Sequence, residues 1–265
     1  MIGLPRPRLA WRGVLASCLL LGLTTHSGSV AAQVNVEVLR NDLKQSGFGS
    51  KLDASFSTFM GNTQGITLGA SALIGFSTGR HLAYLNASGN YSHLSQETQV
   101  SNSFVHARYN LRLNPWLLGE LFGQLEADRF RRIALRRLLG VGPRFEILDL
   151  EHLGICYGMA YMLEHTELSQ GTQPVRPSVV HRFSNYATIT AHLDGERVEL
   201  SKTVYYQPRF DEFGDYRLLS VTGLDFEITG VLSAGIMATL RFEDPTPLDV
   251  KRTDFSLKNT LGVEF

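Results

Sequence analysis

Cysteine is almost absent from this sequence, and the little there is cannot form a disulfide in the mature chain. Of the two cysteines in 265 residues, Cys18 lies in a segment that we expect to be removed on export, which leaves Cys156 as the only thiol. A disulfide within the mature chain is therefore excluded, even in an oxidising compartment.

Long hydrophobic runs and an excess of one charge are also missing. Beyond the first thirty or so residues, no apolar run reaches the length of about 18 residues that a transmembrane helix needs. The 25 lysines and arginines balance the 25 aspartates and glutamates, so the formal net charge is zero. A nucleic-acid partner would call for an excess of Lys and Arg. Membrane-spanning helices and nucleic-acid binding are therefore not expected.

The sequence has no motif for a metal ion or a phosphate group. It contains no Cys-x-x-Cys or His-x-x-x-His pair, and His106, His152 and His192 are isolated on separate predicted strands. The glycines of Gly140–Gly142 are not followed by a helix, as they would be in a phosphate-binding loop. We expect no metal and no cofactor.

The N-terminal segment has the pattern of a secretory signal. Three arginines in the first twelve residues precede a short apolar stretch at Val14–Leu23, and the small residues Val30–Ala32 follow. We therefore expect a signal peptide over residues 1–32. No Pro- or Ser-rich linker divides the rest, so residues 33–265 are expected to form one domain.

Alternation of apolar and polar residues is the dominant pattern of the mature chain. It is clearest in the last segment, where one face carries Phe255, Leu257, Leu261, Val263 and Phe265. About twelve such segments occur, at residues 49–60, 65–77, 81–95, 101–113, 117–128, 137–147, 151–164, 183–193, 198–210, 216–228, 232–243 and 254–265. An even number of strands about ten residues long predicts an all-β fold, a closed antiparallel transmembrane β-barrel. The last strand is expected to close it against residues 52–60.

Outward-facing aromatic residues fall near both ends of the predicted strands, as in the girdles of a membrane barrel. With both termini in the periplasm, the outer girdle consists of Tyr91, Tyr206, Phe210, Tyr216, Phe242 and Phe255, and the inner girdle of Phe76, Phe145, Phe226 and Phe265, with Trp116 beside it. Lys202 and Ser220 interrupt the apolar face of two neighbouring strands, so a register shift at this position stays open.

Several short motifs resemble a known family. Gly61-Asn62 follows the first strand, Tyr206–Pro208 closes the ninth, Asp215–Leu218 opens the tenth, and Thr253-Asp254 precedes the last. In this order, with a final Phe, the chain resembles the YdiY-like family of salt-induced outer-membrane proteins, a domain of unknown function. The resemblance implies a barrel in the Gram-negative cell outer membrane and a link to salt stress. It brings no activity and no catalytic residues.

Three arginines are predicted to face the lumen near the outer mouth. The hairpins place Arg209 opposite Arg217 and bring Arg241 and Glu243 close by, and like charges across strands are destabilising unless acids or an anion intervene. One hypothesis is an anion-attracting constriction formed by Arg209, Arg217 and Arg241. The alternative is a structural network in which Glu243 and Asp211 neutralise them.

An arginine-rich loop is predicted at the outer side, and arginine recognises phosphate with a bidentate fork. Its arginines are Arg129, Arg131, Arg132, Arg136 and Arg137. They are candidates for contact with the phosphates of lipopolysaccharide, and a merely solvated loop is the alternative.

A catalytic site is not favoured. His93 and Ser95 share a strand face, in a spacing that resembles the nucleophile site of an outer-membrane phospholipase. No Asn or Asp is suitably placed on the lipid face of the fourth predicted strand to orient the histidine. We expect the protein not to be an enzyme.

Two functions follow from these observations. The protein is expected to be a narrow or gated pore for small solutes or ions, linked to salt or envelope stress. A non-conducting structural or interaction barrel is the alternative. Its expected partners are outer-membrane lipid, lipopolysaccharide, and the barrel-assembly machinery, which would recognise the strand that ends in Phe265.

Overall fold

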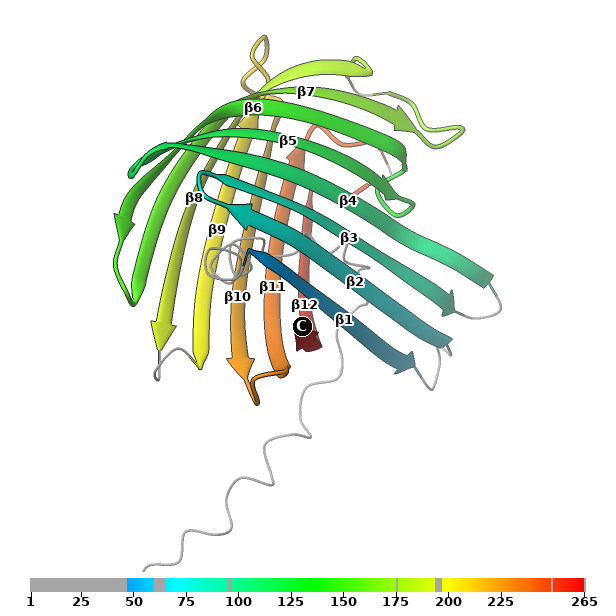
Figure 1. Cartoon of the computed structure of the whole chain (residues 1–265). Coiled ribbons are helices and arrows are strands. Elements are labelled where there is room, and N and C mark those ends of the chain that lie inside the picture. Colours follow the sequence, from blue (N-terminus) through cyan, green and yellow to red (C-terminus); the bar gives the residue numbers. More distant parts are fainter. Residues whose placement is uncertain are drawn as a thin grey trace, which may run out of the picture.

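Twelve antiparallel strands form a closed barrel, and each strand pairs with its neighbours in sequence (Figure 1). The computed structural model describes residues 47–59, 65–94, 97–174, 176–193, 197–248 and 250–264. The strands are β1 (Phe48–Phe59), β2 (Gly65–Thr78), β3 (His81–Leu94), β4 (Glu97–Asn114), β5 (Leu117–Asp128), β6 (Ile133–Asp149), β7 (Leu153–Leu168), β8 (Val179–Leu193), β9 (Val198–Pro208), β10 (Tyr216–Glu227), β11 (Leu232–Asp244) and β12 (Thr253–Glu264). The predicted all-β barrel is confirmed. Within the described ranges, no helix is long and apolar enough to cross a membrane.

The strands on one side of the barrel are longer than predicted. β6 begins at Ile133 instead of residue 137, β7 continues to Leu168, and β8 begins at Val179 instead of residue 183. These extensions carry charged residues, which the sequence pattern assigns to loops. In the structure the alternation continues through them, with Arg136 and Arg182 buried on the inner side and Glu167 exposed beside Arg137.

The outer face keeps its predicted register even where polar residues interrupt it. Lys202 is exposed on the outside of β9 and lies opposite Thr222 of β10, while Ser220 lies opposite Val204. The β9–β10 ladder shows no register shift. The polar positions are therefore true members of the outer face.

Aromatic side chains gather at both rims. At the rim where the β9–β10 turn lies, the Tyr216 ring is 5.6 Å from that of Tyr206 and 5.3 Å from that of Phe242. At the opposite rim, Trp116 stacks on Phe145 at 6.3 Å. These members of the two predicted girdles lie as expected, whereas Phe265 is outside the described residues.

The closing seam between β1 and β12 is shorter than predicted. Only residues 51–54 of β1 pair with β12, against residues 261–264. The expectation that the pairing extends over residues 52–60 is wrong for the described strands. Strand alternation fixes which face a residue joins, but it does not fix how far two edges stay together.

Candidate functional site

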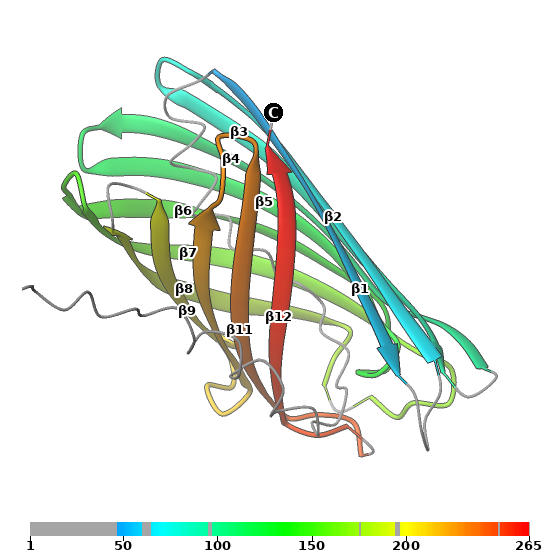
Figure 2. The same ribbon diagram turned by 90° about the horizontal axis from the view of Figure 1, so that it is seen from below.

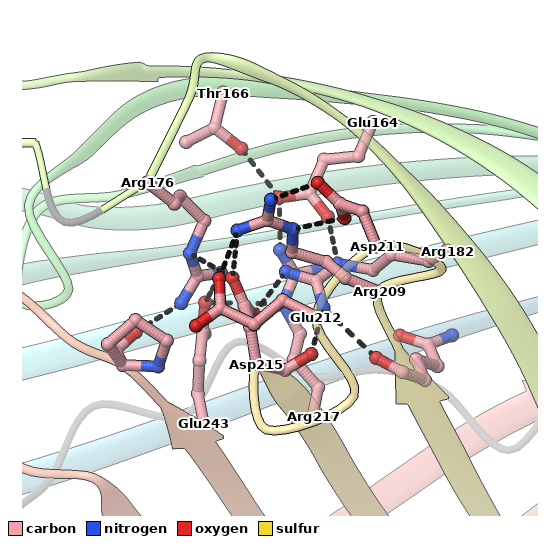
Figure 3. Close-up of polar contacts among 12 residues, drawn as sticks. Glu164, Thr166, Arg176, Arg182, Arg209, Asp211, Glu212, Asp215, Arg217 and Glu243 are labelled. Atoms are coloured by element: carbon pink, nitrogen blue, oxygen red, sulfur yellow. Dashed lines mark hydrogen bonds and ion pairs between the residues drawn. The ribbon is translucent and has the colours of Figure 1, made fainter.

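Charged side chains concentrate at one end of the lumen, where the β5–β6, β7–β8, β9–β10 and β11–β12 connections all lie. Figure 3 shows the part of this group around β7 to β11. We call it the mouth network and define it as Glu126, Arg131, Arg136, Glu164, Arg176, Arg182, Arg209, Asp215, Arg217, Arg241 and Glu243. All of these residues are buried except Arg241 and Arg176, which are partly exposed. The side chain of Arg241 is 17% exposed and that of Arg176 is 9% exposed.

Glu243, near the end of β11, is one centre of the mouth network. Its carboxylate accepts hydrogen bonds from Arg136 at 3.1 Å, Arg176 at 2.9 Å and Arg217 at 3.2 Å, and a further one from Arg131. Four guanidinium groups therefore converge on one buried carboxylate. Charge-assisted hydrogen bonds of this kind are stronger than neutral ones.

Some of these contacts cross the lumen. Arg131 follows β5, and β5 and β11 are six strands apart in the twelve-stranded barrel, on opposite walls. Arg131 nevertheless reaches Glu243 of β11, and Arg241 of β11 lies 3.9 Å from Glu126 of β5. The mouth network therefore bridges the channel from wall to wall.

A second centre lies between β7 and β10. Arg182 donates to Glu164 at 2.7 Å and to Asp215 at 2.9 Å, and Arg217 also binds Glu164. The side chains of Arg182 and Glu164 are fully buried. Buried ion pairs hold only when the remaining donors and acceptors are also satisfied, and Arg182 achieves this by donating to the backbone carbonyls of Gln207 and Asp215.

Arg209 connects the mouth network to solvent. It lies just after β9 and binds Asp215 at 3.2 Å on the buried side, and Asp211 at 2.6 Å and Glu212 at 3.2 Å on the exposed side. The hydrogen bonds that Arg209 donates to the Asp211 carboxylate raise the pKa of Arg209 and hold the pKa of Asp211 below its usual value. Both groups therefore stay charged at neutral pH.

A cavity of about 400 Å³ lies beside the mouth network, between the β11–β12 connection and the ends of β6 and β7. Cationic residues outnumber acidic ones by six to three in its lining. The cationic residues are Arg131, Arg136, Arg176, Arg241, Lys251 and Arg252, and the acidic ones are Glu167, Glu243 and Asp254. A concave surface of this composition concentrates anions.

The lumen is bridged at a second level below the mouth. Tyr186 of β8 donates a hydrogen bond to Glu120 of β5 at 2.5 Å. The Arg108 guanidinium lies 5.4 Å from the rings of both Phe122 and Tyr186 and 3.7 Å from Glu120. Side chains of β5 and β8, which are three strands apart, therefore also meet inside the lumen at this level.

The predicted constriction residues all belong to the mouth network, but as paired groups, and the ladder partner of Arg217 is Gln207 and not Arg209 as predicted. Arg217 binds Glu164 and Glu243, and Arg209 binds Asp211, while Arg241 lies near Glu126. Their contacts are those of the alternative, an arginine–carboxylate network. Whether these arginines also attract anions stays a prediction.

Glu164, Arg176, Arg182 and Asp215 belong to the mouth network but were not predicted as site residues. Arg182 lies in the part of β8 that the pattern left in a loop, and Arg176 lies in the β7–β8 connection. Glu164 is the last residue of the strand predicted at 151–164, on its inward-facing side, and extending the strand predicted at 183–193 by one residue would have revealed Arg182.

The predicted arginine loop is split by the structure. Arg131 and Arg136 are buried in the mouth network, whereas Arg129, Arg132 and Arg137 are exposed. The five arginines therefore do not share one exposed surface, and contact with lipopolysaccharide phosphate stays a prediction. The reason for the split is that β6 begins at Ile133, so alternation turns Arg136 inward and Arg137 outward.

The possible catalytic pair cannot be placed. Ser95 and the side chain of His93 lie outside the described residues. Among the residues that the structure describes, no group of three or more His, Cys, Asp or Glu side chains is arranged to hold a metal ion.

A closed antiparallel barrel with an apolar outer face, two aromatic rims and a charged interior defines a β-barrel of the outer-membrane type. The chain belongs to the family described as "Protein of unknown function, DUF481", whose sequence model matches residues 52–265.

Solved structures with the same architecture include two porins and an autotransporter. The KdgM porin in complex with disordered oligogalacturonate is 8% identical, with a TM-score of 0.46, over 82% of this chain and 98% of that one. The NanC porin is 9% identical, with a TM-score of 0.45, over 82% and 97%. The translocator domain of autotransporter NalP from Neisseria meningitidis is 11% identical, with a TM-score of 0.44, over 86% and 92%. Such a distant likeness concerns the barrel alone. A search of curated proteins finds no match to this chain.

Proposed function

We propose that the protein is a narrow pore of the Gram-negative outer membrane, gated at its outer mouth by the mouth network and favouring small anionic solutes or ions. The observation that carries the proposal is the set of ion pairs between opposite walls, Arg131 with Glu243 and Arg241 with Glu126. The apolar outer face, the aromatic rims and the expected signal peptide support the location.

An anion can open such a mouth by exchange. Guanidinium groups bind carboxylate and phosphate in the same bidentate manner, so an incoming anion competes with Glu243 and Glu126 for their arginines. The cationic cavity beside the mouth network would supply that anion. Larger solutes would be held back by the bridges at the mouth and at Tyr186.

A non-conducting structural or interaction barrel is the second candidate. Its supporting observation is that Arg182 and Glu164 are fully buried and bound on several sides, as in a permanent plug. The link to salt stress is suggested only by the family resemblance. Recognition of the last strand by the barrel-assembly machinery also stays a prediction.

Single-channel recording of the refolded protein in planar bilayers tests the pore. We expect a small conductance with anion preference, and we expect Arg217→Ala to lower that preference, because Glu164 and Glu243 each lose a cationic partner. Arg112→Ala, which removes a charge near the opposite end, is the control and should change the reversal potential less. A stably folded barrel without conductance would support the structural alternative instead.

Contact with lipopolysaccharide is proposed for the exposed arginines alone. Changing Arg129, Arg132 and Arg137 to Gln is expected to reduce the lipopolysaccharide that co-purifies with the barrel, since each change removes an exposed cation at the outer rim. The exposed Arg80 and Arg197 at the opposite end, changed to Gln, are the control. Equal lipopolysaccharide, measured as bound phosphate, in both variants and the wild type would show that these arginines are only solvated.

A further inference from the structure

The barrel has one weak seam, between its first and last strands. β1 pairs with β2 over its whole length, Phe48–Phe59, and β12 pairs with β11 over Thr253–Val263. Between β1 and β12, by contrast, the ladder contains only four residue pairs, from Lys51–Glu264 to Ala54–Leu261. Figure 2 shows the two strands together near the C-terminus and diverging toward the other end.

The paired end of the seam is tightly packed. A Cβ atom on Gly262 would lie 2.7 Å from Asp53 Oδ1 and 2.7 Å from Ser233 Oγ, so both side chains would have to move to admit it. Asp53 also accepts a hydrogen bond from Ser71 at 3.1 Å. The opening is therefore confined to the half of the seam that lies toward the mouth network.

A cavity of about 740 Å³ lies where the two strands diverge. Its lining comes from both sides of the seam, with Ala54 and Leu68 on one side and Ala234, Ile236 and Leu261 on the other. These five residues belong to the apolar outer face. Ser55, Gly69 and Gly235 also line the cavity, and they belong to the inward-facing positions. The lining thus includes outward-facing and inward-facing positions of the wall.

The diverging edges carry backbone groups that have no ladder partners across the seam. Residues 55–59 of β1 and 253–260 of β12 form no pairs with each other. Unpaired backbone N–H and C=O groups are costly in a bilayer, where no water replaces the missing strand. A molecule that lies here must therefore offer polar atoms to the edges as well as apolar surface to the wall.

We propose that this half of the seam is a lateral binding site for a single-chain amphiphile such as a fatty acid. The acyl chain would lie along Leu68, Ile236 and Leu261, and the polar head would bind the backbone edges and Asn259, the amide residue of the lining. The site would give an amphiphile a route between lumen and membrane. It does not depend on ion conduction through the mouth network.

If the β1–β12 ladder continued in its present register toward the mouth network, it would close the site. Lys51 pairs with Glu264 and Ala54 with Leu261, so Ser57 would come opposite Lys258 if the strands joined further. A disulfide between these positions would hold the seam shut.

Photolabelling with a diazirine-bearing fatty acid, in phosphatidylcholine vesicles that contain the refolded full chain, tests the proposal. In a Cys156→Ser background, we expect label on β1 and β12, loss of that label in the oxidised Ser57→Cys/Lys258→Cys variant, and its return on reduction. Ala238→Cys/Leu257→Cys, which joins the already paired strands β11 and β12, is the matched control and should keep the label.

A variant without a disulfide gives an independent measurement. Ala54→Phe places a ring in the cavity and should also lose the label. Labelling spread evenly over all strands, or unchanged in both the oxidised variant and Ala54→Phe, would overturn the proposal. So would disulfide-linked dimers of the Ser57→Cys single variant, because a second copy of the chain would then occupy the seam. An absence of conductance in the pore test leaves this labelling unaffected.

Discussion

Glu243→Gln is expected to loosen the outer mouth and to destabilise the barrel. The change leaves Arg131, Arg136, Arg176 and Arg217 around a neutral amide. Removing one partner of a buried ion pair costs about 3–5 kcal/mol, because the other charge stays buried without compensation. Mutual repulsion of the four guanidinium groups should also widen the lumen, so conductance and anion preference should both rise.

Thermal unfolding followed by circular dichroism, together with single-channel recording, measures both effects. Asp244→Asn is the matched control, since the neighbouring Asp244 pairs with Arg252 at 3.2 Å and that arginine is 63% exposed. An exposed pair of this kind contributes only about 0–1 kcal/mol. If the two variants unfold at the same temperature and conduct equally, Glu243 does not hold the mouth closed.

The strand order and the two faces of the wall could be predicted because they depend on local alternation. Lys202 shows how far this reaches: it faces outward as predicted although it is a charged residue on an apolar surface. The ends of the strands were less predictable. Arg136 and Arg182 lie in the parts of β6 and β8 that extend beyond the predicted strand ends, and their side chains face the lumen. In sequence, a charged residue near a strand end cannot be distinguished from one in a loop.

Only part of the mouth network follows from the sequence. Arg217 and Glu243 lie directly opposite each other in the β10–β11 ladder, so a hairpin model brings them together. Arg131 reaches Glu243 across the lumen, a contact that depends on the width of the barrel and the reach of two long side chains. Neither the width of the barrel nor the reach of these side chains can be predicted from the alternation within one strand.

The extent of the seam has a similar explanation. The pattern of β12 is as regular at Phe255 and Leu257 as at Leu261 and Val263, and yet only residues 261–264 pair with β1. Whether two edges meet depends on the curvature of the whole sheet, to which every strand contributes.

Gly142→Ala is expected to be among the most disruptive single changes in the barrel wall. A Cβ atom at this position of β6 would lie 2.0 Å from the carbonyl oxygen of Met159 and 2.6 Å from the Cα atom of Ala160. Both are backbone atoms of β7, so no side-chain rotation can relieve the clash and the strands must separate. Overpacking typically costs about 1–3 kcal/mol, and a clash with backbone belongs at or above the upper end of this range.

The folded fraction on a heat-modifiability gel and the midpoint of urea unfolding measure this change. Gly119→Ala is the matched control: Gly119 of β5 lies opposite Pro143, next to Gly142, and a Cβ atom there meets nothing within 4 Å. That variant should be neutral or slightly stabilised, because alanine restricts the unfolded chain. Equal stability of the two variants would contradict the close approach of β6 and β7.

Since β6 also carries Arg136, which binds Glu243, a shift of this strand should weaken the mouth network as well. Folded Gly142→Ala protein is therefore expected to show part of the conductance increase of Glu243→Gln, which ties the packing of the wall to the closure of the mouth.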